Sequence, residues 1–261
     1  MIVKNIADII EKFAPKSLAE GYDNVGLMVG NLSVPVNGVL LALDVTEDTV
    51  DEAIRLGVNM ILSHHPLIFS GLKSITGSNY IERTVIKAIQ NNIAIYAAHT
   101  NADSAIGGVS YNLAQQLGVT KLKALDPNNL PCEFTGLGVY GELESEVDAM
   151  EYLAFVKERL NLKALRYSTP HKETIKTVAM CGGSGASYIN KAKSVGADLY
   201  LTGDIKYHDY FLPESDITIA DIGHYEGEIF ILDTFKRLLE TELPDIKVYK
   251  TELQGNPVHV M

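Results

Sequence analysis

Short apolar runs alternate with helix-like segments along most of the chain, and this alternation limits the possible folds more than any other feature. VLLALDV (39–45) and VNMILS (58–63) have the length and composition of buried strands. Between them, Thr46 can cap the start of a helix and Gly57 can end it. A strand, a helix and a second strand in this order are typical of βαβ units. We therefore predict an α/β fold with mixed, mainly parallel sheets flanked by helices.

The second half of the chain repeats this plan. GVNMILSHH (57–65) and GADLYLTGD (196–204) share a leading glycine, an apolar alternation and a polar strand end. An ancient duplication would explain this likeness, and so would the likeness that any two βαβ units share. The turn-rich DPNNLP (126–131) suggests a boundary. We expect two similar α/β lobes, the first made of residues 1–126 plus 227–261 and the second of residues 127–226.

Composition narrows the functional classes. The 261 residues carry a formal net charge of −11, which disfavours binding to nucleic-acid phosphates through clustered Lys and Arg. The two cysteines, Cys132 and Cys181, do not suggest a disulfide framework and fit a reducing cytoplasm. No run approaches the roughly 20 apolar residues of a membrane span. The amphipathic start of the chain also differs from a signal peptide. We expect a cytoplasmic protein that does not enter membranes.

Side chains that can bind metals directly follow four of the predicted strands. In open α/β sheets, ligands bind beyond the carboxyl ends of the strands, so these segments should converge on one site. Five of the seven histidines lie in them. The four segments are SHH (63–65), HTNAD (99–103), GDIKYH (203–208) and DIGHYEGE (221–228).

His224 and Glu228 stand four residues apart at the start of a helix that the pattern predicts over about 225–240. On one continuous helix they would share a face with an apolar stripe that includes Phe235. A carboxylate on a buried stripe is costly unless it is paired or binds a metal. The alternative is a glutamate favoured at the helix N-terminus by the macrodipole.

The adjacent His64 and His65 should point to opposite sides of a strand end, where two imidazoles seldom serve one packing purpose. With Asp103, His224 and Glu228 they make three imidazoles and two carboxylates, more than a mononuclear catalytic site requires. We predict two divalent cations that share one carboxylate and leave positions for water or substrate. Zinc, iron, manganese and nickel suit such donors. The alternative is that one of these two adjacent histidines lies in the core and the other is exposed.

These motifs, together with AEGYDNVGLMVG (19–30), resemble the Nif-three-like dinuclear-metal family, whose members are often labelled type 2 homologues of GTP cyclohydrolase I. The family's W-D-N-x-G-L signature matches at Asp23, Asn24, Gly26 and Leu27, whereas Tyr22 replaces the common tryptophan. SHHP, HTNxD, TGD with a following histidine, and GHxxxE occur in the family's order. The resemblance covers essentially the whole chain.

The resemblance implies a two-lobed subunit with the metal site between the lobes, and a toroidal homohexamer whose sites face an internal cavity. Glu228 would bridge the two metals, with Asp103 on one of them and His224 on the other. The metal ligands that the resemblance implies are His64, His65, Asp103, His224 and Glu228.

Three further residues are candidates for catalysis. His99 could orient a ligand or move protons, and Asp204 and His208 resemble the family's cavity-lining residues. Structural support is the alternative for His99. The glycine-rich CGGSGAS (181–187) could hold a phosphate on its backbone N–H groups, and Cys181 within it is expected to be a small core residue.

The first functional hypothesis is a metal-dependent hydrolase that acts on a phosphorylated or nucleotide-like small molecule, with GTP suggested by the family label only. The alternative is a non-catalytic metal carrier, sensor or assembly scaffold that uses the same ligands. A serine hydrolase is disfavoured because GGSGAS lacks the G-x-S-x-G spacing.

Overall fold

The computed structural model describes residues 1–127, 135–253 and 255–261. The chain folds into two compact units: unit 1 comprises residues 1–102 and 231–255, and unit 2 comprises residues 103–230 and 256–261. The chain first crosses between them at 102/103, earlier than the boundary expected at 126/127. The crossing is early because Leu113 and Val119 pack in the core of unit 2. Residues 128–131 of the predicted boundary segment lie outside the described residues.

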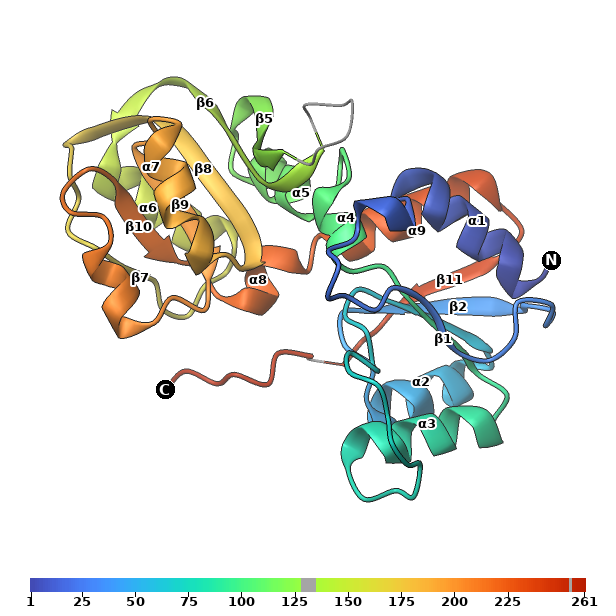
Figure 1. Ribbon diagram of the computed structural model, residues 1–261. Helices are drawn as coiled ribbons and strands as arrows, with labels where there is room; N and C mark the ends of the chain where they lie inside the picture. The colour runs from blue at the N-terminus through green and yellow to red at the C-terminus, as the bar shows by residue number, and fades with distance from the viewer. Residues whose placement is uncertain (128–134, 254) are drawn as a thin grey trace. The chain divides into compact units, whose positions relative to one another are not determined.

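Unit 1 is built on a five-stranded sheet with the order β1-β4-β3-β2-β11. β1 pairs antiparallel with β4, and the remaining neighbours are parallel. The strands are β1 (Gly26–Val29), β2 (Gly38–Ala42), β3 (Met60–Ser63), β4 (Ala94–Ala97) and β11 (Lys247–Lys250). Helices cover both faces of the sheet (Figure 1). On one face lie α2 (Glu47–Leu56) and α3 (Tyr80–Gln90), and on the other lie α1 (Val3–Phe13) and α9 (Ile231–Glu242).

The ends of α2 follow from local sequence, as predicted. The Thr46 side chain accepts a hydrogen bond from the Thr49 backbone N–H at 3.3 Å, which caps the first turn. Gly57 ends the helix with φ of 68°, a left-handed conformation that glycine adopts at little steric cost. Val50 and Ala53 then face the sheet and are fully buried.

Unit 2 contains a six-stranded mixed sheet with the order β5-β6-β8-β9-β10-β7. Its centre, β8-β9-β10, is parallel as predicted, whereas β5, β6 and β7 add antiparallel pairs. Only residues 128–135 separate β5 from β6, fewer than a parallel crossover needs. The strands are β5 (Thr120–Pro127), β6 (Gly136–Asp148), β7 (Arg166–Tyr167), β8 (Thr174–Ser184), β9 (Leu199–Gly203) and β10 (Thr218–Asp221).

Alternate residues of β8 supply the two cores of unit 2. Val178 and Met180 pack with α5 (Val109–Gln116) and α6 (Ala149–Arg159) on one face. Ala179 and Cys181 pack with α7 (Ile189–Ser194) on the other. Cys181 is buried, which agrees with its expected role as a small core residue.

Each unit has three parallel strands at the centre of its own sheet. In unit 1, Val39 of β2 pairs with Met60 of β3. Adding 139 to both numbers gives Val178 and Leu199, which pair in β8 and β9 of unit 2. The third strands, β4 and β10, each lie beside the central strand of their own sheet. The sequence likeness therefore corresponds to matching strand order and register.

The single helix predicted over 225–240 is instead two helices. α8 (His224–Glu228) belongs to unit 2, and α9 begins at Ile231 in unit 1. Phe235 and the rest of the buried stripe lie on α9, so the expectation that His224 and Glu228 continue that stripe is wrong. The chain passes from one unit to the other at 230/231, which interrupts the pattern that the sequence presents as continuous.

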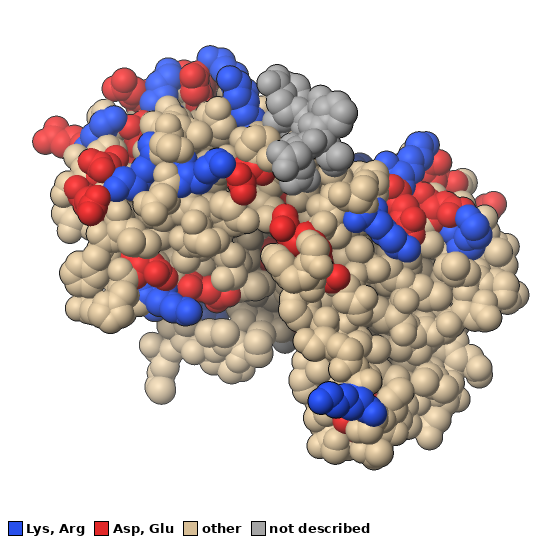
Figure 2. Space-filling model, viewed as in Figure 1, with Lys and Arg blue, Asp and Glu red and all other residues tan. Residues whose placement is uncertain are grey.

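Charges of both signs are interspersed on the face seen in Figure 2, and Lys and Arg do not gather there into one large patch. Within the described ranges, no helix combines the length and the apolar character needed to cross a membrane.

Candidate metal centre

Unit 1 brings three histidines together at the carboxyl ends of β3 and β4. His64 and His65 directly follow β3, and His99 lies two residues after β4. Continued sheet hydrogen bonds position the backbone, from the His64 N–H to the Ala42 carbonyl (3.1 Å) and from the His65 N–H to the Leu43 carbonyl (2.8 Å). Potential ligand atoms of the three histidines lie within 4.8 Å of one another. The sequence predicted this convergence for strand ends.

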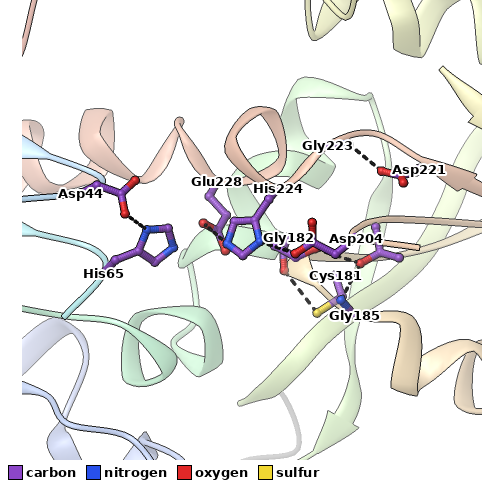
Figure 3. Close-up of polar contacts among 12 residues, drawn as sticks. Asp44, His65, Cys181, Gly182, Gly185, Asp204, Asp221, Gly223, His224 and Glu228 are labelled. Atoms are coloured by element: carbon purple, nitrogen blue, oxygen red, sulfur yellow. Dashed lines mark hydrogen bonds and ion pairs between the residues drawn. The ribbon is translucent and has the colours of Figure 1, made fainter. Parts of the chain in front are cut away.

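An oxygen atom holds the Nδ1 atom of each imidazole. His64 Nδ1 lies 2.9 Å from the Ala98 carbonyl oxygen, and His65 Nδ1 lies 2.9 Å from the Asp44 carboxylate (Figure 3). His99 Nδ1 lies 2.9 Å from the Asp23 carboxylate. Such partners orient metal-binding histidines and leave Nε2 as the nitrogen that can coordinate.

Asp23 connects residues 19–30, the segment that resembles the family's signature, to His99 through a hydrogen bond. Its buried carboxylate also accepts hydrogen bonds from the Thr100 N–H (3.0 Å) and the Thr100 hydroxyl (2.5 Å). Burial alone would raise the pKa of Asp23. The hydrogen bonds from His99 and Thr100 outweigh that effect and lower the pKa far below its ordinary value. Asp23 is therefore an anion that accepts hydrogen bonds only.

Unit 2 brings together His224, Glu228 and Asp204. His224 Nε2 lies 3.2 Å from a Glu228 carboxylate oxygen, the i,i+4 contact that the sequence predicted. His224 Nδ1 lies 2.7 Å from the Asp204 carboxylate, which follows β9 (Figure 3). Glu228 is buried with only 3% of its side chain exposed, so its charge needs compensation there.

Two glycines of β8 leave the space that the Glu228 side chain occupies. A Cβ atom on Gly183 would lie 2.1 Å from Glu228 Oε1, and φ of 66° is a further reason for glycine. A Cβ on Gly182 would lie 2.8 Å from the Gly227 carbonyl oxygen. The glycine-rich segment thus accommodates the carboxylate and the backbone of α8.

Two glycines of residues 181–187 do not favour the phosphate binding that the sequence left possible there. The Gly182 N–H donates to the Ser110 hydroxyl at 3.2 Å, and the Gly185 N–H donates to the Thr202 hydroxyl at 2.9 Å. Both backbone donors are therefore used within unit 2. The glycine-rich segment also continues strand β8 as far as Ser184.

Asp103 and Cys181 complete the surroundings of Glu228. Burial raises the pKa of the Cys181 thiol, and the nearby charges of Asp103 and Glu228 raise it further. A thiol in this state is a poor nucleophile. Asp103 itself lies on the short α4 (Thr100–Ser104) and is partly buried.

His208 occupies a different setting from the other predicted site residues. It is exposed on the 3₁₀ helix η3 (Tyr207–Phe211), where its ring lies 5.2 Å from the Tyr207 ring and 6.3 Å from the Phe211 ring, between centroids. Tyr207 and Phe211 are both largely exposed. His208 is therefore part of an exposed aromatic cluster.

Sequence reasoning missed the role of Asp44 and left that of Asp23 unassigned. Both orient histidines from distant positions, 21 residues from His65 and 76 residues from His99. The position of Asp44 at the end of β2 was the available signal, because all the donors follow parallel strands.

The donors in each unit are of the kinds that bind metal ions. Imidazole nitrogens with anchored Nδ1 atoms and a buried carboxylate suit first-row divalent cations. The chain is therefore a candidate metal-binding α/β protein. Each of its two α/β units presents imidazole or carboxylate groups at the ends of parallel strands.

The chain belongs to the Duf34/NIF3 (NGG1p interacting factor 3) family, whose sequence profile matches residues 1–257. It is 42% identical over 231 residues to a Clostridium perfringens protein named "GTP cyclohydrolase 1 type 2 homolog", with 87% of each chain covered. It is 38% identical over 256 residues to a Clostridium acetobutylicum protein of the same name, which covers 97% of this chain and 90% of the relative. The resemblance predicted from the motifs is confirmed.

Solved structures agree with this assignment. A Bacillus cereus protein related to NIF3 superposes with a TM-score of 0.91 at 28% identity, covering 100% of this chain and 99% of that one. Reduced HcgD from Methanocaldococcus jannaschii superposes with a TM-score of 0.83 at 31% identity, covering 97% and 98%. The predicted α/β fold with two helix-flanked sheets is confirmed.

Proposed function

We propose that the protein is a metal-dependent hydrolase that uses two divalent cations and acts on a phosphorylated or nucleotide-like small molecule. The ligands would be His64, His65, Asp103, His224 and Glu228, with Glu228 shared between the ions. The observation that carries the proposal is that oriented donors occur in both units, with Asp44 behind His65 and Asp204 behind His224. Zinc, iron, manganese and nickel are the candidate ions.

The chain's own residues would perform the remaining steps. Bound cations would supply Lewis acidity that activates water and polarises the bond to be cleaved. His99, held by an anionic Asp23, or the exposed His208 would move the proton. Asp204 would keep His224 in the orientation that a ligand needs. The names of the relatives in the two Clostridium species support a nucleotide as the substrate class.

The test combines metal analysis with an activity screen. Protein purified without added metal or chelator is analysed for metal content, and the metal found is restored before a panel of nucleotides, GTP included, and phosphoesters is assayed. We expect Glu228→Gln to bind less metal than the wild-type chain and to lose turnover. His208→Ala should keep the metal and lose turnover. Turnover that survives loss of the metal would contradict the proposal.

If metal binds and no substrate turns over, the same screen would support a non-catalytic metal carrier, sensor or assembly scaffold. We also propose a homo-oligomer, a hexamer by family resemblance, which light scattering on the purified chain tests directly.

A further inference from the structure

We propose that unit 1 alone holds one divalent cation through the three imidazoles of His64, His65 and His99. The proposal rests on the proposed function only in taking a divalent cation as the ligand. It adds His99 as a metal-binding residue and makes unit 1 the first site to fill. His208 then remains the proton-transferring residue of the proposed hydrolase.

The three rings form a nearly regular triangle. Their centroids are 5.0 Å apart for His64 and His65, 5.3 Å for His64 and His99, and 5.5 Å for His65 and His99. Potential ligand atoms lie within 4.8 Å of one another. Tetrahedral zinc with Zn–N bonds of about 2.1 Å places two nitrogens about 3.4 Å apart. Small side-chain rotations therefore bring all three nitrogens to one ion.

The hydrogen-bond partners decide which nitrogen can coordinate. The Ala98 carbonyl oxygen can only accept, so His64 must donate its Nδ1 proton. The carboxylates of Asp44 and Asp23 accept from His65 and His99 in the same way. In each neutral ring the lone pair is consequently on Nε2. A cation interacts favourably with three such lone pairs at once.

The charges behind the rings favour the same ion. Asp44 and Asp23 lie against two of the three imidazoles and together contribute two negative charges, which a divalent cation balances. The Asp23 side chain is fully buried, so its charge is weakly screened.

The backbone holds the three residues before any ion arrives. The His64 and His65 N–H groups donate to the carbonyls of Ala42 and Leu43, and the Ala98 N–H donates to the Ser63 carbonyl at 3.0 Å. Little conformational entropy is therefore lost on binding. Three neutral imidazoles favour zinc, nickel or cobalt over magnesium or manganese, which prefer oxygen ligands.

The experiment removes the unit 2 donors from the full chain and measures what remains. The variant Asp103→Asn/His224→Ala/Glu228→Gln is stripped of metal and titrated with Co²⁺ alone, with visible ligand-field absorption and elemental analysis as readouts. We expect one equivalent of Co²⁺ to bind. Adding His99→Asn to this variant should weaken binding by more than about tenfold, since even loss of an orienting partner costs 10–100-fold.

His259→Asn in the same background is the matched control, because His259 is exposed and far along the sequence from the three histidines. It should bind Co²⁺ unchanged. No binding by the folded triple variant, or equal binding with and without His99, would overturn the proposal. If the wild-type chain binds two equivalents of Co²⁺, the proposed two-metal centre is retained, whichever of these results the triple variant gives. A wild-type chain that binds one equivalent, lost with His99→Asn, contradicts the two-metal centre and supports the unit 1 site.

Circular dichroism shows whether the triple variant folds. If the triple variant does not fold, the wild-type chain and the His99→Asn variant are compared instead by calorimetric titration with Co²⁺. Loss of the tighter binding step in His99→Asn supports the proposal, and an unchanged isotherm overturns it.

Discussion

The Glu82 carboxylate accepts five hydrogen bonds from the three residues Thr76, Ser78 and Asn79 and so holds the loop that precedes α3. In return, the Asn79 side chain accepts from the Glu82 N–H at 3.0 Å and caps the helix. Backbone hydrogen bonds from Thr76 and Ser78 lower the pKa of Glu82 from 4.5 to about 2. A single residue thereby joins a loop to a helix start.

We expect Glu82→Gln to destabilise the protein in a pH-dependent way. Because folding lowers the pKa of Glu82, its contribution is fully present above pH 4.5 and is lost as the pH falls toward 2. The difference in free energy of unfolding between wild type and variant should therefore shrink over this range. Urea denaturation at several pH values measures it. Glu144→Gln, at an exposed position of β6, controls for the lost charge, and a pH-independent difference at Glu82 would contradict the account.

We propose that Asp204 acts on the candidate metal centre through His224, whose Nδ1 atom it contacts at 2.7 Å, rather than as a ligand. We expect Asp204→Asn to weaken metal binding by about 10- to 100-fold, because the Nδ1 atom of His224 loses its anionic partner. Chelator competition measures the affinity. Asp245→Asn, at an exposed site in unit 1, should leave it unchanged. Equal affinities for the two variants would show that Asp204 does not orient His224.

At the scale of elements, strand β8 and helix α8 fit together only because β8 carries glycines. The Gly183 backbone lies where any side chain would meet Glu228 and His224. Gly223, the residue before α8, has φ of 81°, and a Cβ there would lie 2.2 Å from Glu226 Oε2. Glycines in β8 and directly before α8 therefore leave room for two glutamate side chains of α8.

Gly183→Ala should separate this packing role from backbone strain. Gly196 provides a matched control, because its φ is 74° and a Cβ there would meet nothing within 4 Å. Alanine at either position should lower the free energy of unfolding by about 1–2 kcal/mol through left-handed strain. Only Gly183→Ala should also weaken metal binding, because its methyl group displaces Glu228. Isothermal titration tests this, and similar metal affinities for both variants would refute it.

At the scale of the whole molecule, the chain passes between the units three times, at 102/103, 230/231 and 255/256. The proposed ligands are His64, His65 and His99 in unit 1 and Asp103, His224 and Glu228 in unit 2. Metal binding should therefore stabilise each of the two units.

Removing metal should lower the melting temperature. A ligand at 100 times its dissociation constant stabilises the folded state by about 2.7 kcal/mol. We expect the metal-loaded chain to melt at a higher temperature than the chain in excess chelator, and Glu228→Gln to reduce the difference. Far-UV circular dichroism is the suitable probe because the chain contains no tryptophan. Equal melting temperatures with and without metal would contradict binding to the folded state.

Much of the fold and of the candidate site could be predicted because the signals are local. The ends of α2 depend on Thr46 and Gly57, and strand-end histidines depend on which residues follow an apolar run. The contact between His224 and Glu228 follows from helical spacing. Each of these features is decided within a few residues, where backbone geometry leaves few alternatives.

The sequence by itself determined the α/β class, the strand ends and the identity of the donors, because those depend on neighbours along the chain. Only the tertiary structure decided that residues 225–240 break into two helices, that Gly183 makes room for Glu228, and that Asp23 orients His99. These outcomes depend on contacts between residues tens of positions apart. Such contacts form only when the strands have taken their order in the sheets. The spacing of residues along the chain does not determine that order.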